Sequence, residues 1–508
     1  MHPTFVSLAP RLVSALRRNN FSLDGLEITL GDAGVAAMDR HDPTGVCWAA
    51  SGADMAATVA RAFIAHQPQQ RVFFEDLFGT DVVDALLSIH ALVADPRTPE
   101  VFHVAFDARP REIAGNDIIV FSDVDGSMAH PVGPAVERVL GVGSASLSLL
   151  ASTPLTPTAR VLDLGTGCGV QALAQATCAR SVTATDVLDR AVFFAQATIA
   201  GAGLDDVIEC RQGSWFEPVA GQQFDRIVAN PPFVVGLPEV GHVYRDSGMN
   251  LDGATEYVVK NCPDFLAPSG TAHLLGAWIH TADQPWQQRV SQWIPTHGVL
   301  ALFLQRDVAD PSLYVDTWLR DEGLDLRDPD TAARAQGWLD HFSRHHVEGV
   351  GFGFIALKKI SDELPSVVRY EDFTAQYGAH LGEEVEAFFG RLEWLLRQDE
   401  DSLLDARFAL HPEVAVEDIS TVDREQGMGF RRATLRISRM DGPRYQHEID
   451  EDVLALLAGL NPQGLSLRDI IGLLSATRGV DEEELAPQVA SIARDLIDHG
   501  FMIPAELL

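Results

Sequence analysis

The chain has 508 residues, of which 46% are hydrophobic, and it carries a formal net charge of −34 at pH 7. This length predicts about three domains, and the apolar content is sufficient for sizeable cores. Such a charge disfavours binding to the phosphate backbone of long nucleic acids, which depends on clustered lysine and arginine, although it does not exclude a local basic groove. A protein, peptide or small-molecule partner is favoured.

The five cysteines form no C-x-x-C pair and no metal-like cluster with histidine. Their odd number in a chain of this size indicates reduced thiols and a cytoplasmic location, and no metal site is expected. The first 21 residues lack the apolar core of a signal peptide, and no apolar run is long enough to span a bilayer. We therefore expect a soluble cytoplasmic protein without a membrane partner. The sequence leaves open whether the protein forms a homo-oligomer.

Residues 1–130 are predicted to form an N-terminal domain in which helices precede strands. Helical apolar spacing occurs over 5–18, 32–38, 53–66 and 80–89. Two strands, 102–106 and 117–121, are expected to form a hairpin around Pro110 and Arg111. Helices followed by a two-stranded wing resemble a winged-helix domain. Because the chain is acidic, dimerisation or substrate orientation is favoured over DNA binding as its role.

A predicted buried strand, 161–164, leads into the glycine-rich segment Gly165-Thr166-Gly167-Cys168-Gly169. Three glycines at alternate positions allow a tight turn and let a ligand approach the backbone. The helix expected over 170–178 points its free N–H groups back at this loop. The spacing differs from the dinucleotide pattern G-x-G-x-x-G and disfavours NAD. Asp163 places a carboxylate where a cationic amino-acid group can bind; the alternative is a plain strand-to-helix turn.

The next strand, 181–185, ends at Asp186. An acid at the carboxyl end of the strand that follows a glycine loop is placed to accept hydrogen bonds from ribose hydroxyls. The alternative is an N-cap for the helix that begins near Leu188. The glycine loop upstream favours the ribose interpretation.

A further buried strand, 227–229, ends in Asn230-Pro231-Pro232-Phe233. The two prolines fix φ and remove two N–H donors, so the Asn230 side chain and the Pro231 carbonyl can both accept from one planar NH2 group. Pinning both hydrogens frees the nitrogen lone pair for in-line attack on a methyl donor, while Phe233 offers a flat face for stacking. Catalysis then consists mostly of positioning. The alternative is a rigid turn.

Together the two segments resemble the cofactor loop and the catalytic loop of class I S-adenosylmethionine methyltransferases that act on planar amino or amide nitrogens. The resemblance implies an α/β fold with a Rossmann-like seven-stranded sheet, S-adenosylmethionine as the cofactor and N-methyltransferase activity. It implies a catalytic role for Asn230, Pro231, Pro232 and Phe233. It implies cofactor contacts for Asp163, Gly165, Thr166, Gly167, Gly169, Asp186, Ser214, Trp215 and Asn230.

Within this family, the turn after the third strand usually carries an acid that meets the adenine amino group. The third strand is predicted at 207–210, and the matching position is Ser214, whose hydroxyl can also hydrogen-bond adenine. Trp215 or Phe216 is expected to pack on the adenine or, equally, in the ordinary core.

The segment 242–253 resembles the R-x-G-G-x-D-G segment of protein-glutamine N5-methyltransferases, in which the catalytic tetrapeptide ends in tyrosine. N-P-P-F is the form found in ribosomal RNA guanine N2-methyltransferases, normally followed by histidine where this chain has Val234. Tyr244 and Arg245 are expected to line the substrate mouth or to lie on the surface. The favoured acceptor is a protein or peptide amide; the alternative is an rRNA, tRNA or DNA base, at adenine N6 or guanine N2. An inactive cofactor-binding scaffold is disfavoured by Asn230 and Asp163.

The rest of the catalytic domain, 131–360, reads as an open α/β sheet. Strands are predicted at 271–278, 299–305 and 349–359, the last antiparallel and closely packed because Gly and Phe alternate in it. Helices are predicted at 284–294, 311–320 and 331–346. Because both motifs end strands, both should lie at the carboxyl edge of the sheet, where open α/β sheets bind ligands.

Residues 361–508 hold 30 acidic and 13 basic residues, a net charge of −17. Helices are predicted at 388–396, 449–460, 467–474 and 482–497, with a short strand at 435–437 and with Ser466 and Asp481 as N-caps. We expect a mostly helical, winged-helix-like domain whose acidic surface is either a docking site or simply solvated. The layout of the whole chain resembles long actinobacterial methyltransferases with uncharacterised end domains.

Overall fold

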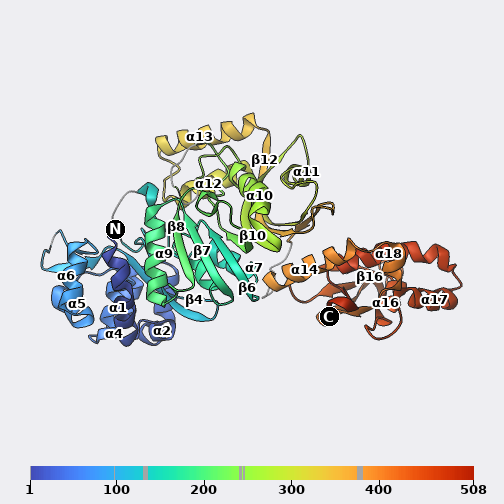
Figure 1. Ribbon diagram of the computed structural model, residues 1–508, viewed down its shortest axis with the longest axis horizontal. Helices are drawn as coiled ribbons and strands as arrows, with labels where there is room; N and C mark the ends of the chain where they lie inside the picture. The colour runs from blue at the N-terminus through green and yellow to red at the C-terminus, as the bar shows by residue number, and fades with distance from the viewer. Residues whose placement is uncertain (1, 97, 130–134, 239–242, 244–245, 374–380) are drawn as a thin grey trace. The chain divides into compact units, whose positions relative to one another are not determined.

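The computed structural model describes residues 2–96, 98–129, 135–238, 243, 246–373 and 381–508 (Figure 1). The chain separates into two compact units. One consists of Met1–Leu150 and Leu155–Tyr370, and the other of Ala151–Pro154 and Glu371–Leu508. The two domains predicted at 1–130 and 131–360 therefore lie mostly within the first of these compact units. Among the described residues, none of the helices combines the length and apolar character that a membrane crossing requires.

Six helices form most of the N-terminal region, and each short loop before α2, α3 and α4 supplies a capping side chain, Ser22, Asp42 and Asp54. The helices are α1 Thr4–Arg18, α2 Leu23–Asp39, α3 Pro43–Ala49, α4 Met55–Phe63, α5 Arg71–Phe78 and α6 Thr80–Ser88. A small antiparallel sheet in the order β1-β3-β2 accompanies them. Its strands are β1 Gln69–Gln70, β2 Leu92–Ala94 and β3 Val101–Val104.

The predicted hairpin between 102–106 and 117–121 is wrong. Strand β3 pairs with β1 and β2, whereas β5 Asn116–Ser122 pairs with β4 Asp107–Ile113. The turn between β4 and β5 is Ala114-Gly115, both with positive φ, which suits a two-residue hairpin turn. Pro110, expected in the turn, lies in β4 opposite Ile119. A two-stranded sheet tolerates it because each strand has one free edge.

The central sheet of the first unit has eight strands in the order β13-β11-β12-β10-β9-β6-β7-β8. They are β6 Thr158–Leu164, β7 Ala179–Asp186, β8 Ile208–Gln212, β9 Phe224–Ala229, β10 Leu266–Thr281, β11 Val299–Ala309, β12 Val347–Lys359 and β13 Val367–Asp372. The strands from β6 to β9 pair in parallel, and β12 runs antiparallel to both its neighbours, as predicted. The chain thus has a Rossmann-like α/β fold with a mixed sheet. The edge strand β13 was not predicted.

Helices cover both faces of this sheet. They are α7 Ser144–Ser152, α8 Val170–Gln175, α9 Asp189–Ala202, α10 Gly253–Phe265, α11 Trp286–Ser291, α12 Pro311–Asp321 and α13 Pro329–Arg344. One core joins the sheet to α10 and α11, and a second joins the far ends of β10 and β12 to α12 and α13. Helix α1 packs against α9, which attaches the N-terminal helices to the sheet domain (Figure 1).

The C-terminal unit has its own apolar core, formed chiefly by α14 to α18. Its helices are α14 Leu381–Leu395, α15 Glu400–Asp405, α16 Glu451–Ala458, α17 Leu467–Arg478 and α18 Glu482–Asp498. Its strands are β14 Phe408–Leu410, β15 Val414–Val422, β16 Phe430–Arg439, β17 Gln446–Glu448 and β18 Met502–Pro504. Ser466 and Asp481 cap α17 and α18, as predicted. The predicted strand 435–437 lies within β16, but the rest of the long β15–β16 hairpin was missed because most of its side chains are exposed and only its inner end is buried.

Strand β12 shows why its glycines alternate with larger residues. A Cβ on Gly353 would lie 1.9 Å from the backbone carbonyl oxygen of Leu304 on the neighbouring strand. Backbone atoms cannot move aside as a flexible side chain can, so the predicted close packing is confirmed at this position.

We expect Gly353→Ala to lower the free energy of unfolding by roughly 1–3 kcal/mol or more, because the added methyl group overpacks two paired strands. Gly337→Ala, in the exposed part of α13 where the added Cβ meets no described atom within 4 Å, should instead raise it by about 0.5–1 kcal/mol. Chemical denaturation of both variants checks this pair. Equal effects of the two changes would contradict the packing assignment.

Candidate active site

The glycine loop and the N-P-P-F segment meet at one edge of the sheet. Strands β6 and β9 are parallel neighbours, with Leu164 opposite Ala229, so Gly165 and Asn230 leave the sheet side by side. A Cβ on Gly165 would lie 3.9 Å from the Asn230 backbone oxygen. The strand order reverses between these two strands, which is where open α/β sheets bind ligands. The structure therefore brings together the two segments that the sequence placed at this edge.

The glycine loop leaves open space beside its backbone. Gly165, Gly167 and Gly169 all have positive φ, at 77°, 56° and 95°, a conformation that glycine adopts without strain. A Cβ on Gly167 would meet no described atom within 4 Å. The backbone N–H groups of Gly165 and Thr166 both donate to the Thr185 carbonyl at 2.9 Å, which ties the loop to β7. The loop therefore forms a rigid, uncrowded cradle.

Asp163 is buried beneath this loop at 1% exposure. Its Oδ2 accepts from the Thr166 hydroxyl at 2.6 Å and from the Ala172 N–H at 3.0 Å, whereas its Oδ1 has no hydrogen-bond partner among the described residues. Burial raises the pKa of this carboxyl to about 7. The Thr166 hydroxyl is thus engaged within the loop, and the Oδ1 atom of Asp163 is the acceptor that a ligand cation can satisfy.

Asp186 accepts two backbone hydrogen bonds at the carboxyl end of β7, whereas the N-cap residue of α9 is Leu188. Its Oδ1 accepts from the Leu188 N–H at 3.0 Å, just before α9, and its Oδ2 accepts from the Gly167 N–H at 3.0 Å. Burial is the largest cause that raises the pKa of this carboxyl, and the backbone donors oppose it. Each carboxylate oxygen keeps a second lone pair, so Asp186 can hold the loop and still accept from a hydroxyl group.

The turn after β8 places Trp215 in a costly backbone conformation. Its φ is +48°, which is unusual for a bulky residue and requires support from its surroundings. The indole packs against the Tyr257 ring at 5.2 Å, and both rings are partly buried. Phe216, the other aromatic candidate, is buried and stacks on Phe265 at 4.4 Å, so it belongs to the core. Ser214 is half-buried in the same turn.

The N-P-P-F segment is held by aromatic side chains from distant parts of the chain. Asn230 and Phe233 are half-buried, and Pro231 is buried. The Phe233 ring lies 5.1 Å from that of Phe352 and 6.5 Å from that of Trp318. Packing against two rings fixes the orientation of Phe233, and with it the flat face that the sequence assigned to the substrate.

Sequence reasoning missed the residues that anchor the exit of this segment. The Val235 N–H donates to the Tyr314 hydroxyl at 2.8 Å, and Trp338 Nε1–H donates to the Val235 carbonyl at 3.2 Å. Buried Asp252 accepts from Arg289 at 2.9 and 2.6 Å. The resemblance of the segment 242–253 could have indicated Asp252 from the sequence, whereas nothing in the sequence indicated its partner Arg289.

Tyr244 and Arg245, the predicted substrate residues, lie outside the described residues.

Cys168 lies within the glycine loop and is buried. Burial raises the pKa of its thiol to about 12. It therefore packs as a small apolar side chain, as expected from the sequence.

Comparison with known proteins identifies the central segment. Residues 139–261 match a family described as Methyltransferase small domain. The Release factor glutamine methyltransferase of Shewanella oneidensis is 38% identical over 128 residues, which are 23% of this chain and 44% of that protein. The corresponding protein of Xylella fastidiosa is 45% identical over 162 residues, which are 29% of this chain and 56% of that protein. The chain contains a class I methyltransferase domain.

The match is partial on both sides. The chain spans about half the length of the curated relatives it matches. Its flanks, 18–101 and 386–504, match two families described as Domain of unknown function, DUF7059 and DUF7782. Among solved structures, a T. thermophilus 16S rRNA N2 methyltransferase in complex with AdoMet and guanosine is 20% identical, with 52% of this chain and 66% of that chain covered and a TM-score of 0.28.

Class I methyltransferase domains use S-adenosylmethionine, and the residues present fit that group. The open space beside Gly167 accommodates a ligand against the backbone. Oδ1 of Asp163 lacks a partner among the described side chains, and a cationic amino group would supply one. Asp186 retains acceptor capacity for sugar hydroxyls, and the partly buried Trp215 offers an aromatic surface.

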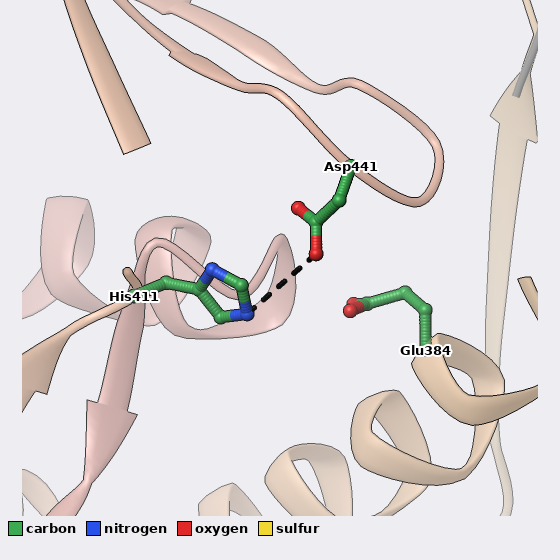
Figure 2. A group of neighbouring side chains, drawn as sticks. All are labelled: Glu384, His411 and Asp441. Atoms are coloured by element: carbon green, nitrogen blue, oxygen red, sulfur yellow. Dashed lines mark ion pairs between the residues drawn. The ribbon is translucent and has the colours of Figure 1, made fainter. Parts of the chain in front are cut away.

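The C-terminal unit contains a group of side chains with metal-ligating atoms. Glu384, His411 and Asp441 point toward one another, with His411 Nε2 3.9 Å from Asp441 Oδ2 (Figure 2). Both acids already pair with Arg439, each at 2.8 Å. His411 Nδ1 accepts the Glu413 N–H at 3.2 Å, so the neutral imidazole carries its proton on Nε2, the atom that faces the acids. Since ligation through Nε2 requires that atom to be free of its proton, we interpret this group as an ion-pair network.

Asp163 gives the unliganded protein a specific pH dependence. The pKa of its carboxyl is about 7 in the folded state against an ordinary value of 3.8, so the neutral carboxyl contributes stability that is complete below about pH 4 and is lost as the pH rises through 7. We expect this loss to reach about 4 kcal/mol.

Asp163→Asn should keep the two hydrogen bonds to the side-chain oxygen and remove this pH dependence. Urea unfolding of both proteins between about pH 4 and pH 8 measures the difference. If the free energies of unfolding of the two proteins change in parallel with pH, the Asp163 carboxyl is ionised in the folded state throughout this range. That result would contradict the raised pKa assigned to Asp163.

Proposed function

We propose that this protein is an S-adenosylmethionine-dependent N-methyltransferase that acts on a planar amide nitrogen of a protein, with the glutamine side chain of a release factor as the first substrate to test. The observation that carries the proposal is that the glycine loop and the N-P-P-F segment leave neighbouring parallel strands side by side, at the switch point of the sheet. The similarity of residues 139–261 to the methyltransferase family, and of the same region to release factor glutamine methyltransferases, supports it.

The chain's own residues perform the positioning. When bound, S-adenosylmethionine supplies an electrophilic methyl group. The Asn230 side-chain oxygen and the Pro231 carbonyl accept one hydrogen each from the acceptor NH2, which turns the nitrogen lone pair away from them. Phe233, held by Phe352 and Trp318, stacks on the planar group that carries the nitrogen. The nitrogen loses its proton after transfer, so the site needs no strong base.

A protein acceptor is favoured over a nucleic acid. The curated relatives are named for a glutamine of a release factor, and a net charge of −34 opposes association with a long phosphate backbone. One residue favours the alternative: the tetrapeptide ends in Phe233, the form that resembles rRNA guanine N2-methyltransferases. A base methyltransferase acting on adenine N6 or guanine N2 is therefore the second candidate.

The flanking regions are proposed to orient the acceptor. The order α4-β1-α5-α6-β2-β3 with strand order β1-β3-β2 supports a winged-helix domain within residues 1–130. The C-terminal unit, near the predicted 361–508, retains a helix pair, α17 and α18, beside the β14–β18 ladder, which supports a related arrangement. The five free cysteines agree with a cytoplasmic location, which we also propose.

Asn230→Ala should reduce methyl transfer by about 100-fold or more, because the acceptor nitrogen loses one of its two hydrogen-bond acceptors. Cofactor affinity, measured by calorimetry, should change little. The assay is transfer of tritiated methyl groups to a purified release factor and, in parallel, to the protein and RNA fractions of a cell lysate.

Asn116→Ala, at the exposed end of the β4–β5 turn, is the matched control and should label as wild type does. Label in the RNA fraction would select the base methyltransferase instead. An Asn230→Ala protein that labels as fast as wild type would refute the catalytic assignment.

A further inference from the structure

A groove of about 630 Å³ runs along one side of the β15–β16–β17 sheet in the C-terminal unit. Its lining comes from β16, β17, α16 and α18. Leu435 and Leu496 form a buried apolar floor, and Ile492 stands at 38% exposure beside them. Neither the candidate active site nor the ion-pair network of Figure 2 uses these residues.

One wall of the groove is an unpaired strand edge. Strand β17 pairs with β16 only from Arg436 to Ser438, and the last contact along this side is the Ile449 N–H to the Leu435 carbonyl at 2.9 Å. The chain then turns into α16, so within the described residues β16 continues through Thr434, which pairs with Ile419 of β15, and through Ala433, which lies at an irregularity of that ladder; no strand pairs with β16 on the groove side here. Backbone groups at such an edge can pair with an added strand.

The groove's uncompensated charge is negative. Its arginine, Arg432, is neutralised by Asp418 at 2.7 Å and Glu451 at 2.9 Å. Glu448 and Asp495 also line the groove; Glu448 attracts the Arg436 guanidinium and Asp495 attracts the His447 imidazole, but in the described part of the chain neither carboxylate lies within ion-pair distance of a cation or accepts a side-chain hydrogen bond. The surrounding region, 361–508, has a net charge of −17. These two carboxylates around an apolar floor complement cations that flank an apolar side chain.

We propose that this groove binds an extended, basic peptide segment of a protein partner, which adds a strand alongside Ala433 and Thr434 of β16. Main-chain hydrogen bonds to the open edge supply affinity, an apolar side chain of the segment covers Ile492, and its arginine or lysine side chains pair with Glu448 and Asp495. The proposal stands independently of methyl transfer.

The test uses the full-length protein and a fluorescein-labelled peptide in which valine alternates with arginine. Fluorescence anisotropy should show binding of this peptide, and no binding of its counterpart with glutamate in place of arginine. A central proline, which removes a backbone donor, should weaken binding by about tenfold. The double change Glu448→Gln with Asp495→Asn should weaken binding by about tenfold, and so should Ile492→Ser.

The matched control is Glu483→Gln with Glu484→Gln, an equal charge change at the exposed start of α18, which should leave binding unchanged. Thermal unfolding verifies that each variant is folded. The proposal is overturned if the control weakens binding as much as the groove variant, if the proline peptide binds as tightly as the parent, or if a folded groove variant binds like wild type. Self-association that the groove variant abolishes, without peptide binding, would assign the groove to a second copy of the chain and also overturn it.

Discussion

The parallel pairing of β6 with β9 is the constraint on which the candidate active site depends. Because Leu164 lies opposite Ala229, the residues that follow them leave the sheet at the same level, one chain entering a glycine turn and the other a pair of prolines. Two backbone hydrogen bonds to the Thr185 carbonyl tie the first turn to β7, and two fixed proline φ angles stiffen the second. The proximity of Gly165 and Asn230 is thus a property of the sheet register, and the surrounding aromatic side chains only set orientation.

Two buried carboxylates organise the glycine loop from within. Asp163 collects donors from Thr166 and Ala172, and Asp186 collects them from Gly167 and Leu188, so each acid links a strand end to the following helix. Burial raises the pKa of both carboxyls, which means that the ligand-free loop carries an electrostatic cost. A cationic ligand that pairs with Asp163 would offset part of that cost, so loop stability and ligand affinity are coupled.

The sequence was informative where local chemistry dictates structure and uninformative where distant contacts do. The glycine loop, the N-P-P-F turn and the predicted strands follow from apolar runs, glycine and proline, and the structure places them as expected. The support of Val235 by Tyr314 and Trp338 could not be predicted, because it depends on how helices some eighty to one hundred residues later pack on the sheet. The prediction of the hairpin failed for a different reason: Pro110 suggested a turn, whereas the turn lies at Ala114-Gly115.

The burial of Cys168 determines how reactive its thiol is within the glycine loop. A methyl donor reacts with any good nucleophile nearby, and thiolates are among the best in proteins. Because burial raises the pKa of Cys168 to about 12, its thiol stays protonated at neutral pH. The glycine loop can therefore carry a sulfur atom without presenting a reactive thiolate.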